Sequence, residues 1–547
     1  MFINQISSKE RQWIIGFAVV LLAVTCIPYW IAYARAAPDW RFTGFVFSVE
    51  DGNSYIAKML SGAAGAWLFR TPYTAMEQQG FLAFLPYILL GKLTAPPAQH
   101  EQLVALFHLF RMLAGFCLII ATYDFLSLYL KNTTLRKLAL VIVAAGGGIG
   151  WVLLFWQPYG TQRLPLEFYS PETFGFLSIY GIPHLAAARA LLLWGLVLYL
   201  RPHEKETRFN PAVRGGLVWF LLGFFQPATV VIGWGVLAAH LAATGGLRWL
   251  RNRRTGLSEW GDWIRYFQRA VVMGMISLPI VFYTVVSFLT DPFLRGWASQ
   301  NIILSPPPVD YLLAYGLFLP FSILGVRHVL KGYPLKGPLL AGWLLALPFL
   351  AYAPFNLQRR LVEGGWVVMV VLAFAFLDQH RRTGIIAAKI LFTVSMIPSA
   401  LLVTGHISLT AIEPPIYQRA DTIAVFNFLA ENARPGDVVL ASYATSNPLP
   451  AWAPLRVVIG HGPESVGLAE LQPRVARFFK SETPDQERID LINDKNVRFI
   501  IYGPEERKLS THILNAWNPM LAHFVEPIYA HGNYQVFMVK DLNDDTP

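Results

Sequence analysis

The chain has 547 residues, of which 54% are hydrophobic and only 14% are charged, and its formal net charge is +10. An ordinary soluble domain carries about 25% charged residues, so this composition excludes one. The Lys and Arg residues gather in short segments between long apolar runs, a pattern that orients membrane helices and does not indicate nucleic-acid binding. The sequence therefore predicts a polytopic α-helical membrane protein.

The apolar runs predict about 11 membrane crossings, and several of the runs reach the roughly 18 to 20 residues that span a bilayer. They cover residues 13–33, 103–130, 138–156, 184–200, 215–243 (counted twice), 270–290, 311–326, 339–355, 366–377 and 385–403. With the N-terminus in the cytoplasm, basic segments such as 131–137 and 248–254 fall inside. The loop 34–102 and the segment that follows residue 410 then face outward.

Two of the apolar stretches do not fit a simple crossing. Residues 215–243 are interrupted at Gln226-Pro227 and have basic residues at both ends, which predicts either a tight pair of short helices or a re-entrant hairpin. Residues 81–93 are too short to span, so we expect a helix that lies at the outer membrane interface.

The composition changes near residue 411, where charged residues return and short strand-like runs alternate with helical ones. Strands are predicted at 437–442, 456–460, 497–502 and 535–539, and helices at 421–432, 468–480 and 484–494. This alternation predicts a small α/β domain with a mainly parallel sheet. The predicted division is a transmembrane domain over 1–410 and an extracytoplasmic α/β domain over 411–547.

The first candidate site is the acidic pair Glu50-Asp51 in the outer loop. A helix that starts near Ser48 would place Asp51, Ser54, Tyr55 and Lys58 on one face, which offers a base, two hydroxyls and a cation. The structural alternative is a capping box, because Ser48 and Asp51 have the spacing at which an acid only satisfies the backbone at a helix start.

The second candidate site is Arg359-Arg360, the one strongly basic pair that the topology places outside. Guanidinium groups grip phosphate oxygens bidentately and keep their charge at low dielectric, so the pair could bind a lipid-linked phosphate. The alternatives are snorkelling to lipid headgroups and a local ion pair between Arg360 and Glu363. If both candidate sites serve one reaction, Asp51 and the arginine pair should face one shared cavity.

Several further residues are weaker candidates. Arg70 lies in the same outer loop as Asp51 and could contact a phosphate or remain a surface charge. Arg111 and Arg189 lie near the outer ends of their helices and could point into an outward-facing cavity or pair structurally with a carboxylate such as Glu167 or Glu172. His184, at the head of its helix, is either a cavity residue or a packing residue. His461 and Glu464 follow a predicted strand, where turn chemistry alone explains the adjacent glycines.

Other chemistries find no support. Cys26 and Cys117 lie within apolar runs, so the sequence predicts no disulfide framework and no Cys-based metal site. It contains no Gly-x-x-x-x-Gly-Lys-Ser/Thr phosphate loop and no His-Glu-x-x-His motif. No motif requires a cofactor, and a divalent cation stays an open alternative.

This arrangement resembles the GT-C membrane glycosyltransferases, which include protein mannosyltransferases and the aminoarabinose transferase of lipid A. In those proteins an acidic motif follows the first helix, as Glu50-Asp51 does here, an interfacial helix comes next, as in 81–93, and an arginine lies near the start of the second span, as Arg111 does. The phrases at 170–172, 182–184 and 457–462 also resemble uncharacterised bacterial members. The order Glu-Asp replaces the Asp-Glu of protein mannosyltransferases, which leaves open which acid is the base.

The resemblance implies transfer of a sugar from a polyprenyl-phosphate donor to a glycan, lipid or protein acceptor, on the outer face of the bacterial cytoplasmic membrane. Asp51 would deprotonate an acceptor hydroxyl, the configuration would invert, and Arg359 or Arg360 would stabilise the leaving phosphate. One alternative is a transporter or flippase for lipid-linked or anionic substrates, with Pro227 in a discontinuous helix. The other is a non-catalytic partner in an envelope complex.

Overall fold

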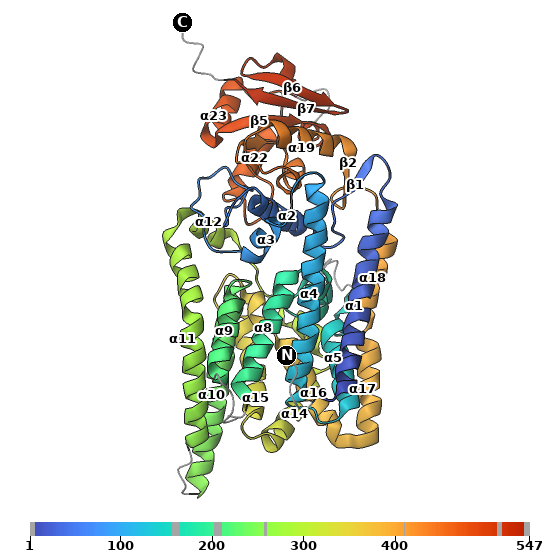
Figure 1. Cartoon of the computed structure of the whole chain (residues 1–547), viewed down its shortest axis with the longest axis vertical. Coiled ribbons are helices and arrows are strands. Elements are labelled where there is room, and N and C mark those ends of the chain that lie inside the picture. The colour runs from blue at the N-terminus through green and yellow to red at the C-terminus, as the bar shows by residue number, and fades with distance from the viewer. Residues whose placement is uncertain are drawn as a thin grey trace. The chain divides into compact units, whose positions relative to one another are not determined.

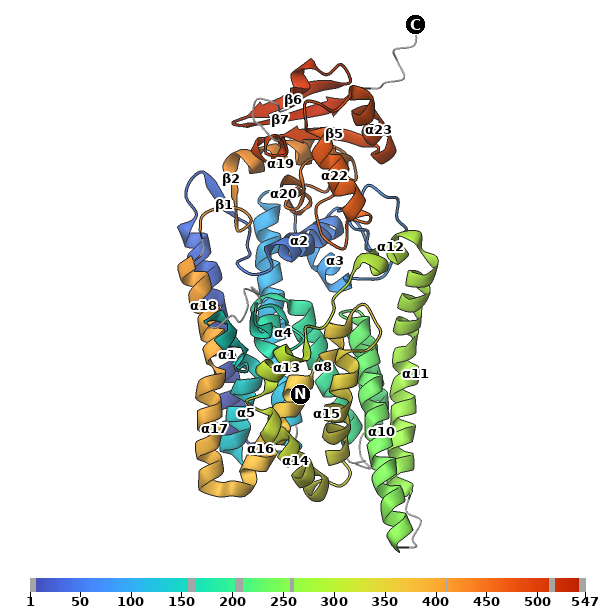
Figure 2. The ribbon, with the colours of Figure 1, turned by 180° about the vertical axis from the view of Figure 1, so that it is seen from behind.

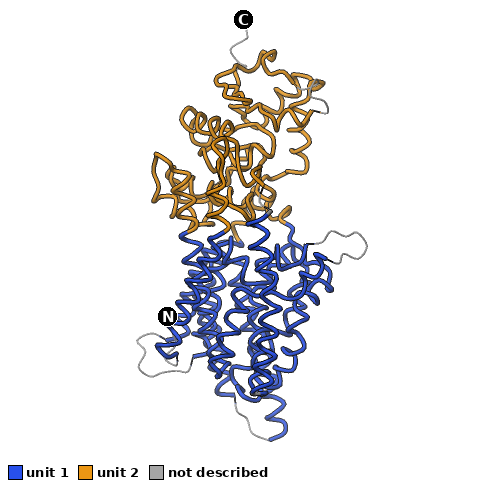
Figure 3. Tube along the Cα trace, turned by 90° about the vertical axis from the view of Figure 1, so that its right-hand side faces the viewer, with its two compact units in different colours: residues 1–27, 109–285, 302–408 blue, residues 28–108, 286–301, 409–547 orange. Residues whose placement is uncertain are grey.

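The computed structural model describes residues 6–155, 164–201, 210–255, 260–409, 411–510 and 517–540. The chain forms two compact units, drawn in different colours in Figure 3. Unit 1 comprises Met1–Ile27, Leu109–Val285 and Ile302–Ser408, and unit 2 comprises Pro28–His108, Val286–Asn301 and Leu409–Pro547. The acidic loop therefore belongs to the same unit as the C-terminal segment, whereas the boundary at residue 411 and its outward placement stay predictions.

Unit 1 is a bundle of helices that run side by side along their length, as Figures 1 and 2 show. Its main helices are α1 (Ser8–Arg35, in part), α4 (Gln99–Ser127, in part), α5 (Thr133–Ala145), α8 (Pro183–Leu200), α9 (Pro211–Gly223), α10 (Pro227–Thr255), α11 (Gly261–Thr290, in part), α13 (Pro308–Tyr315), α14 (Leu319–Gly332), α15 (Gly337–Ala351), α16 (Gly365–Leu377), α17 (Arg381–Ser395) and α18 (Ile397–Leu409). Short elements join them: η1 (Gly150–Leu154), α6 (Leu166–Tyr169), α7 (Gly175–Gly181), η3 (Gln358–Val362) and η4 (Asp378–His380).

Within the described ranges, eight helices are long and apolar enough to cross a membrane. The pair α13 and α14, bent by 72°, is a ninth candidate, and α9 and α15 are shorter apolar helices. The predicted polytopic α-helical membrane protein is therefore confirmed, while the count of about 11 crossings is not.

The break in residues 215–243 lies where the sequence placed it. Pro227 is the first residue of α10, where the missing N–H of a proline costs no hydrogen bond. The prediction of two short helices is right for α9, which has 13 residues, and wrong for α10. Helix α10 has 29 residues because it continues through the basic segment to Thr255.

Helix α16 forms the centre of unit 1. All but one of its 13 residues are buried, and its sequence is apolar on every side, as expected for a helix with neighbours all round. Ser322 of α14 donates a hydrogen bond to the backbone oxygen of Met369 at 2.8 Å, and the Nε1 of Trp366 donates to the backbone oxygen of Ile142 at 3.2 Å.

Unit 2 begins with the loop that carries the acidic pair. Its helices are α2 (Val49–Ala63), α3 (Leu85–Gly91) and α12 (Pro292–Gln300). The helix predicted over 81–93 is thus shorter, because Phe84 takes the left-handed conformation with φ of 50° and α3 starts only after it. Strand β1 (Trp40–Phe42) pairs antiparallel with β2 (Tyr417–Arg419), which joins the loop to the C-terminal segment.

The C-terminal segment forms a five-stranded sheet in the order β4-β3-β5-β7-β6. Its strands are β3 (Val438–Leu440), β4 (Arg456–Val457), β5 (Val497–Tyr502), β6 (Val525–His531) and β7 (Tyr534–Val539). Its main helices are α19 (Ala420–Asn432), α22 (Leu468–Phe478) and α23 (Asp485–Lys495). Short helices also lie between strands: α20 (Tyr443–Ser446), α21 (Leu449–Trp452), α24 (Pro504–Arg507) and η6 (Pro519–Leu521). Strands β4, β3 and β5 are parallel, but β7 is antiparallel to both β5 and β6. The α/β domain is confirmed, and the expected mainly parallel sheet is wrong because the sheet is mixed.

The loop 28–108 shares a hydrophobic core with this sheet. Ala57 of α2 and Tyr73 pack in the same buried cluster as Phe426, Val439 and Phe499. A single core therefore fixes α2, and with it the acidic pair, against the C-terminal segment within unit 2.

Candidate active site

The acidic pair lies in the first turn of α2. Ser48, just before the helix, has φ of 50° and makes no side-chain hydrogen bond to the helix backbone. Its hydroxyl instead donates to Oδ2 of Asp51 at 2.5 Å. The capping-box alternative is therefore wrong, because Ser48 holds the acid rather than the helix start.

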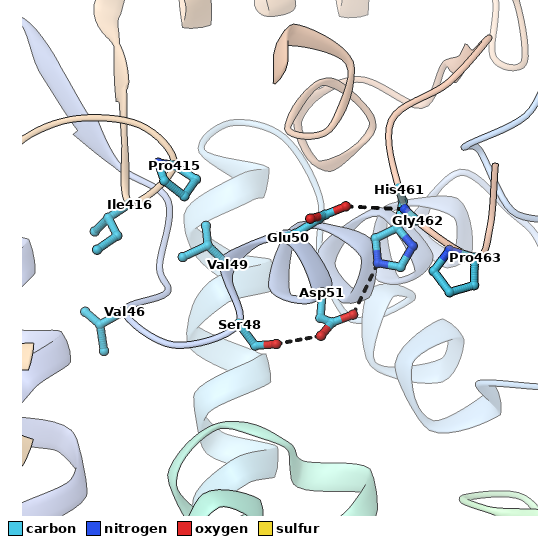
Figure 4. A pocket seen from close by; sticks show the side chains of 10 residues that line it. All are labelled: Val46, Ser48, Val49, Glu50, Asp51, Pro415, Ile416, His461, Gly462 and Pro463. Atoms are coloured by element: carbon cyan, nitrogen blue, oxygen red, sulfur yellow. Dashed lines mark hydrogen bonds and ion pairs between the residues drawn. The ribbon is translucent and has the colours of Figure 1, made fainter. Parts of the chain in front are cut away.

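Asp51 and Glu50 line a pocket of about 570 Å³ in unit 2, shown in Figure 4. Its wall is made by residues from two segments that are far apart in the sequence: Val46, Ser48, Val49, Glu50 and Asp51 from the loop, and Pro415, Ile416, His461, Gly462 and Pro463 from the C-terminal segment. The volume is within the range of small-molecule sites, roughly 300–1,000 Å³.

His461 reaches the acidic pair from the turn that follows β4. Its Nε2 lies 3.2 Å from Oδ1 of Asp51, and its side chain is only 9% exposed, whereas that of Asp51 is 46% exposed. Glu50 accepts hydrogen bonds from the Tyr443 hydroxyl and, at 3.3 Å, from the backbone N–H of Gly462. Both acids are thus anchored by the C-terminal segment and remain at the pocket wall.

Neighbouring groups shift the pKa values of Asp51 and His461. Burial opposes ionisation of Asp51, but the hydrogen bond and charge of His461 outweigh it and lower the pKa of Asp51 to about 2. Burial likewise opposes protonation of His461, and the charge of Glu464 together with Asp51 outweighs it and raises the pKa of His461. Asp51 is an anion at neutral pH, and His461 keeps its proton to a higher pH than an ordinary histidine.

The predicted polar face of α2 exists, but its groups are satisfied within the protein. Lys58 is buried and lies 2.6 Å from Oε1 of Glu464, and Ser54 donates to the same carboxylate at 2.9 Å. The ring of Tyr55 stacks on that of Tyr87 with a centroid distance of 4.8 Å. A phosphate at Lys58 would have to displace a buried carboxylate, so this geometry does not favour the predicted phosphate-binding role of Lys58.

Unit 1 holds the second candidate site. The Nε atoms of Arg359 and Arg360 lie 3.8 and 3.7 Å from the carboxylate of Glu172, and both Nε atoms are buried without a hydrogen-bond partner. The guanidinium of Arg359 also covers the ring of Tyr169 at 5.0 Å. Two cations therefore share one carboxylate.

The suggested local pair between Arg360 and Glu363 is not formed. Glu363 is buried and pairs instead with Arg189, whose Nη2 lies 3.0 Å from Oε2 and whose Nε donates to Oε1. Arg189 also donates to the backbone oxygen of Pro171 at 2.6 Å. The alternative in which Arg189 pairs with a carboxylate is thus confirmed, and the partner is Glu363.

An apolar cavity of about 950 Å³ lies beside this charged cluster within unit 1. It is lined by α10, α13, α14 and α15 and by Val362, two residues after Arg360. Val362 belongs to η3, the element that also carries Arg359 and Arg360. The cavity therefore reaches the element that holds the arginine pair.

The other predicted residues lie elsewhere. Arg111 is buried and donates to Oγ1 of Thr25 at 2.9 Å and to Sγ of Cys26 at 3.1 Å, so it ties α4 to α1. His184 is buried at the start of α8. Arg70 is exposed and lines a separate pocket of about 460 Å³ in unit 2. Substrate contacts of these three residues stay predictions.

The shared cavity of Asp51 and the arginine pair also stays a prediction, since Asp51 belongs to unit 2 and Arg359 and Arg360 to unit 1. What sequence reasoning missed is the His461–Glu464 turn, to which it gave only a turn role. Two signals were available: a pair of ionisable residues three apart after an apolar strand, and the resemblance of 457–462 to uncharacterised bacterial members. Across the described ranges, no group of three or more His, Cys, Asp or Glu side chains could hold a metal ion.

Comparison with protein-family models and with curated protein sequences gives no match. Among solved structures, the archaeal oligosaccharyltransferase AglB from Archaeoglobus fulgidus, in complex with an inhibitory peptide and a dolichol-phosphate, aligns with a TM-score of 0.54 at 12% identity, over 99% of this chain and 75% of that one. ArnT from Cupriavidus metallidurans aligns in the apo state with a TM-score of 0.52 at 12% identity, over 95% and 97% of the two chains. Its structure bound to undecaprenyl phosphate aligns with a TM-score of 0.50 at 12% identity, over 95% of this chain and 98% of that one.

At this level of identity the likeness establishes architecture and not chemistry. It extends over nearly the whole of this chain and nearly the whole of ArnT. The chain therefore has the fold of AglB and ArnT, and this agrees with the polytopic helical fold that the sequence resemblance implied.

Proposed function

We propose that this protein is an integral-membrane glycosyltransferase that moves a sugar from a polyprenyl-phosphate donor to a glycan, lipid or protein acceptor. The observation that carries the proposal is the pairing, within unit 1, of a large apolar cavity with two arginines whose Nε atoms are buried and make no hydrogen bond. A polyprenyl phosphate has the same two parts, an apolar chain and an anionic head.

The arginine pair suits the head of such a donor. Arg359, Arg360 and the single carboxylate of Glu172 leave one positive charge in excess, and guanidinium forks bind phosphate oxygens bidentately. The structures of AglB and ArnT named above contain a dolichol-phosphate and undecaprenyl phosphate, respectively. A developing phosphate dianion would gain from the same cations as the sugar leaves.

The pocket at Glu50 and Asp51 suits the acceptor. The oxygen of an acceptor hydroxyl attacks the anomeric carbon from the face opposite the phosphate, the bond from that carbon to the phosphate oxygen breaks, and its electron pair stays on the phosphate. The configuration therefore inverts, and the hydroxyl proton passes to Asp51. Because the pKa of Asp51 is about 2, the proton moves late, when the attacking oxygen has already become acidic.

The donor site is tested by the binding of undecaprenyl phosphate to the purified full-length protein in detergent. We expect the Arg359→Ala, Arg360→Ala double variant to lose at least about tenfold in affinity, since charge-assisted bonds contribute roughly 1.5–3 kcal/mol each. The matched control is Arg253→Ala, Arg254→Ala, an exposed basic pair at the end of α10 that should leave binding unchanged. Equal affinity in the wild type and the first double variant would refute the donor site.

Assays on the same purified protein also distinguish a glycosyltransferase from a transporter. Asp51→Asn should keep the affinity for undecaprenyl phosphate and lose transfer from undecaprenyl-phosphate hexoses and pentoses by at least about 10²-fold. Binding by the wild type without any release of undecaprenyl phosphate from these donors would favour the transporter alternative over the transferase.

A further inference from the structure

The turn at residues 460–464 places a histidine between two carboxylates. On one side, Nε2 of His461 lies 3.2 Å from Oδ1 of Asp51, and on the other, Nδ1 lies 3.8 Å from Oε1 of Glu464. The second oxygen of Asp51 accepts the hydroxyl of Ser48 at 2.5 Å. Asp51 is therefore held from both oxygens, once by its own loop and once by the C-terminal segment.

Glu464 is itself held by several hydrogen-bond donors. It is buried and accepts hydrogen bonds from Lys58 at 2.6 Å, from Ser54 at 2.9 Å and from the hydroxyl of Thr71. The ammonium of Lys58 also lies over the ring of Phe84 at 4.5 Å. Removing one partner of a buried ion pair leaves an uncompensated buried charge, so the pair between Lys58 and Glu464 keeps its geometry.

The backbone that carries His461 is also fixed. The hydroxyl of Ser465 accepts from the N–H groups of Gly460 at 3.0 Å and His461 at 3.1 Å and donates to the backbone oxygen of Tyr73 at 2.9 Å. Nδ2 of Asn447 donates to the backbone oxygen of Gly460 at 2.8 Å. The turn that carries the ring therefore cannot move away from Asp51 without breaking several of these bonds.

We propose that His461 is a positioning residue for Asp51: in its protonated form it joins Asp51 to the buried Lys58–Glu464 pair and holds the acid at the wall of the pocket. This inference rests on the proposed function, in which Asp51 receives the acceptor proton. The charges then alternate along Lys58, Glu464, His461 and Asp51 and sum to zero. With His461 neutral, the same groups carry one uncompensated negative charge.

The arrangement makes the site sensitive to pH. The groups that face His461 are Asp51 and Lys58 from α2, Glu464 from its own turn, and the ring of Tyr73 at 5.3 Å, while Glu50 and Tyr443 bind the adjacent Gly462. Because the folded protein raises the pKa of His461, the link is complete below the ordinary value of 6.5 and is lost as the pH rises through the raised pKa. Because it lowers the pKa of Asp51, the link is complete above 3.8 and is lost as the pH falls through about 2.

The direct test is a ¹⁵N-histidine NMR titration of the full-length protein in detergent. The signal of His461 is identified as the one lost in His461→Gln, or as the one that moves in Asp51→Asn, which changes a half-exposed side chain and should fold. We expect a titration midpoint above 6.5 in the wild type and lower midpoints in Asp51→Asn and in Glu464→Gln. A wild-type midpoint at or below 6.5, or one unchanged by both substitutions, would overturn the proposal.

The second readout is the pH profile of transfer. We expect His461→Gln to lower kcat by about tenfold or more, since misplacing a reacting group by about 1 Å costs on the order of 10²-fold, while the KM for the donor stays the same. We expect the wild type to lose activity at alkaline pH as His461 loses its proton, and we expect this fall to be absent from the variant. The control His531→Gln, which changes an exposed histidine of β6, should behave as the wild type.

The two readouts separate this inference from the proposed function. If the NMR titration behaves as expected but no undecaprenyl-phosphate sugar is consumed, His461 positions Asp51 and the transferase assignment fails. If transfer occurs and His461→Gln keeps the wild-type profile, the transferase assignment holds and the role of His461 is wrong.

Discussion

At the scale of single residues, Glu172 decides how strongly the arginine pair attracts a second anion. Its buried carboxylate lies within 4 Å of the Nε atoms of both Arg359 and Arg360 but in hydrogen-bond geometry with neither. Such a carboxylate neutralises part of the charge that a phosphate would use, and it does so without satisfying the Nε donors. Glu172 is therefore a resident anion that a phosphate must share or displace.

We expect Glu172→Gln to bind undecaprenyl phosphate more tightly, because the substitution removes the competing charge and keeps the shape of the side chain. The gain should be about fivefold, since one partly screened ion pair is worth on the order of 1 kcal/mol. Equilibrium binding in detergent measures it. Asp378→Asn is the control, because it removes one negative charge at the other end of α16. Weaker binding by Glu172→Gln would mean that the carboxylate orients the arginines for the phosphate instead of competing with it.

Residue chemistry also shows what the sequence could predict. The position of Asp51 after the first apolar run and the topological exception at Arg359-Arg360 follow from hydropathy and charge, which are local properties. The contact between Asp51 and His461 joins residues that are 410 apart and depends on how two segments pair, which no local pattern encodes. Lys58 was placed on the correct face of α2, but its partner Glu464 could be found only in three dimensions.

At the scale of elements, glycine sets how closely the central helices of unit 1 approach. A Cβ added at Gly325 of α14 would lie 2.0 Å from the backbone oxygen of Leu372 in α16. Small residues at such contacts let membrane helices pack backbone to backbone, where dispersion replaces the hydrophobic effect as the main attraction. The contact of α14 with α16 therefore depends on the absence of a side chain at this position.

We expect Gly325→Ala to destabilise the protein by about 1–3 kcal/mol or more, since overpacking forces a backbone shift. The matched control lies on the same helix: a Cβ at Gly332 would meet nothing within 4 Å, so Gly332→Ala should leave the melting temperature nearly unchanged. Thermal unfolding of the two detergent-purified variants gives the comparison. Equal melting temperatures of the two variants would show that α14 and α16 can move apart at this contact without loss of stability.

A helix or strand could be predicted from the sequence when its signal lies within a few neighbouring residues. The break at Pro227 and the helices of the C-terminal segment follow from proline chemistry and periodicity. Strand β6 was missed because it contains Pro527 and an irregular register against β7 between Pro527 and Tyr529. Helix α3 is shorter than its apolar run because Phe84 takes the left-handed conformation just before it, which hydropathy does not encode.

At the scale of the whole molecule, each compact unit is assembled from three separate stretches of chain. The pairing of β1 with β2 and the shared core of Tyr73 with Phe426 explain why the first loop belongs with the C-terminal segment. Both stretches should therefore lie on one side of the membrane. The positive-inside rule assigns that side, because the basic segments 131–137, 248–254 and 380–382 should be cytoplasmic.

This sidedness can be measured with single cysteines. In a Cys26→Ala, Cys117→Ala background, Ser481→Cys should react with a membrane-impermeant maleimide added to intact cells, and Thr383→Cys should react only after the membrane is permeabilised. Both side chains are exposed, so access and not burial decides the outcome. The contrast should be close to complete, because a bilayer excludes a charged reagent. Labelling of Thr383→Cys alone in intact cells would invert the topology and place the Asp51 pocket in the cytoplasm, where the proposed acceptor chemistry on the outer face could not occur.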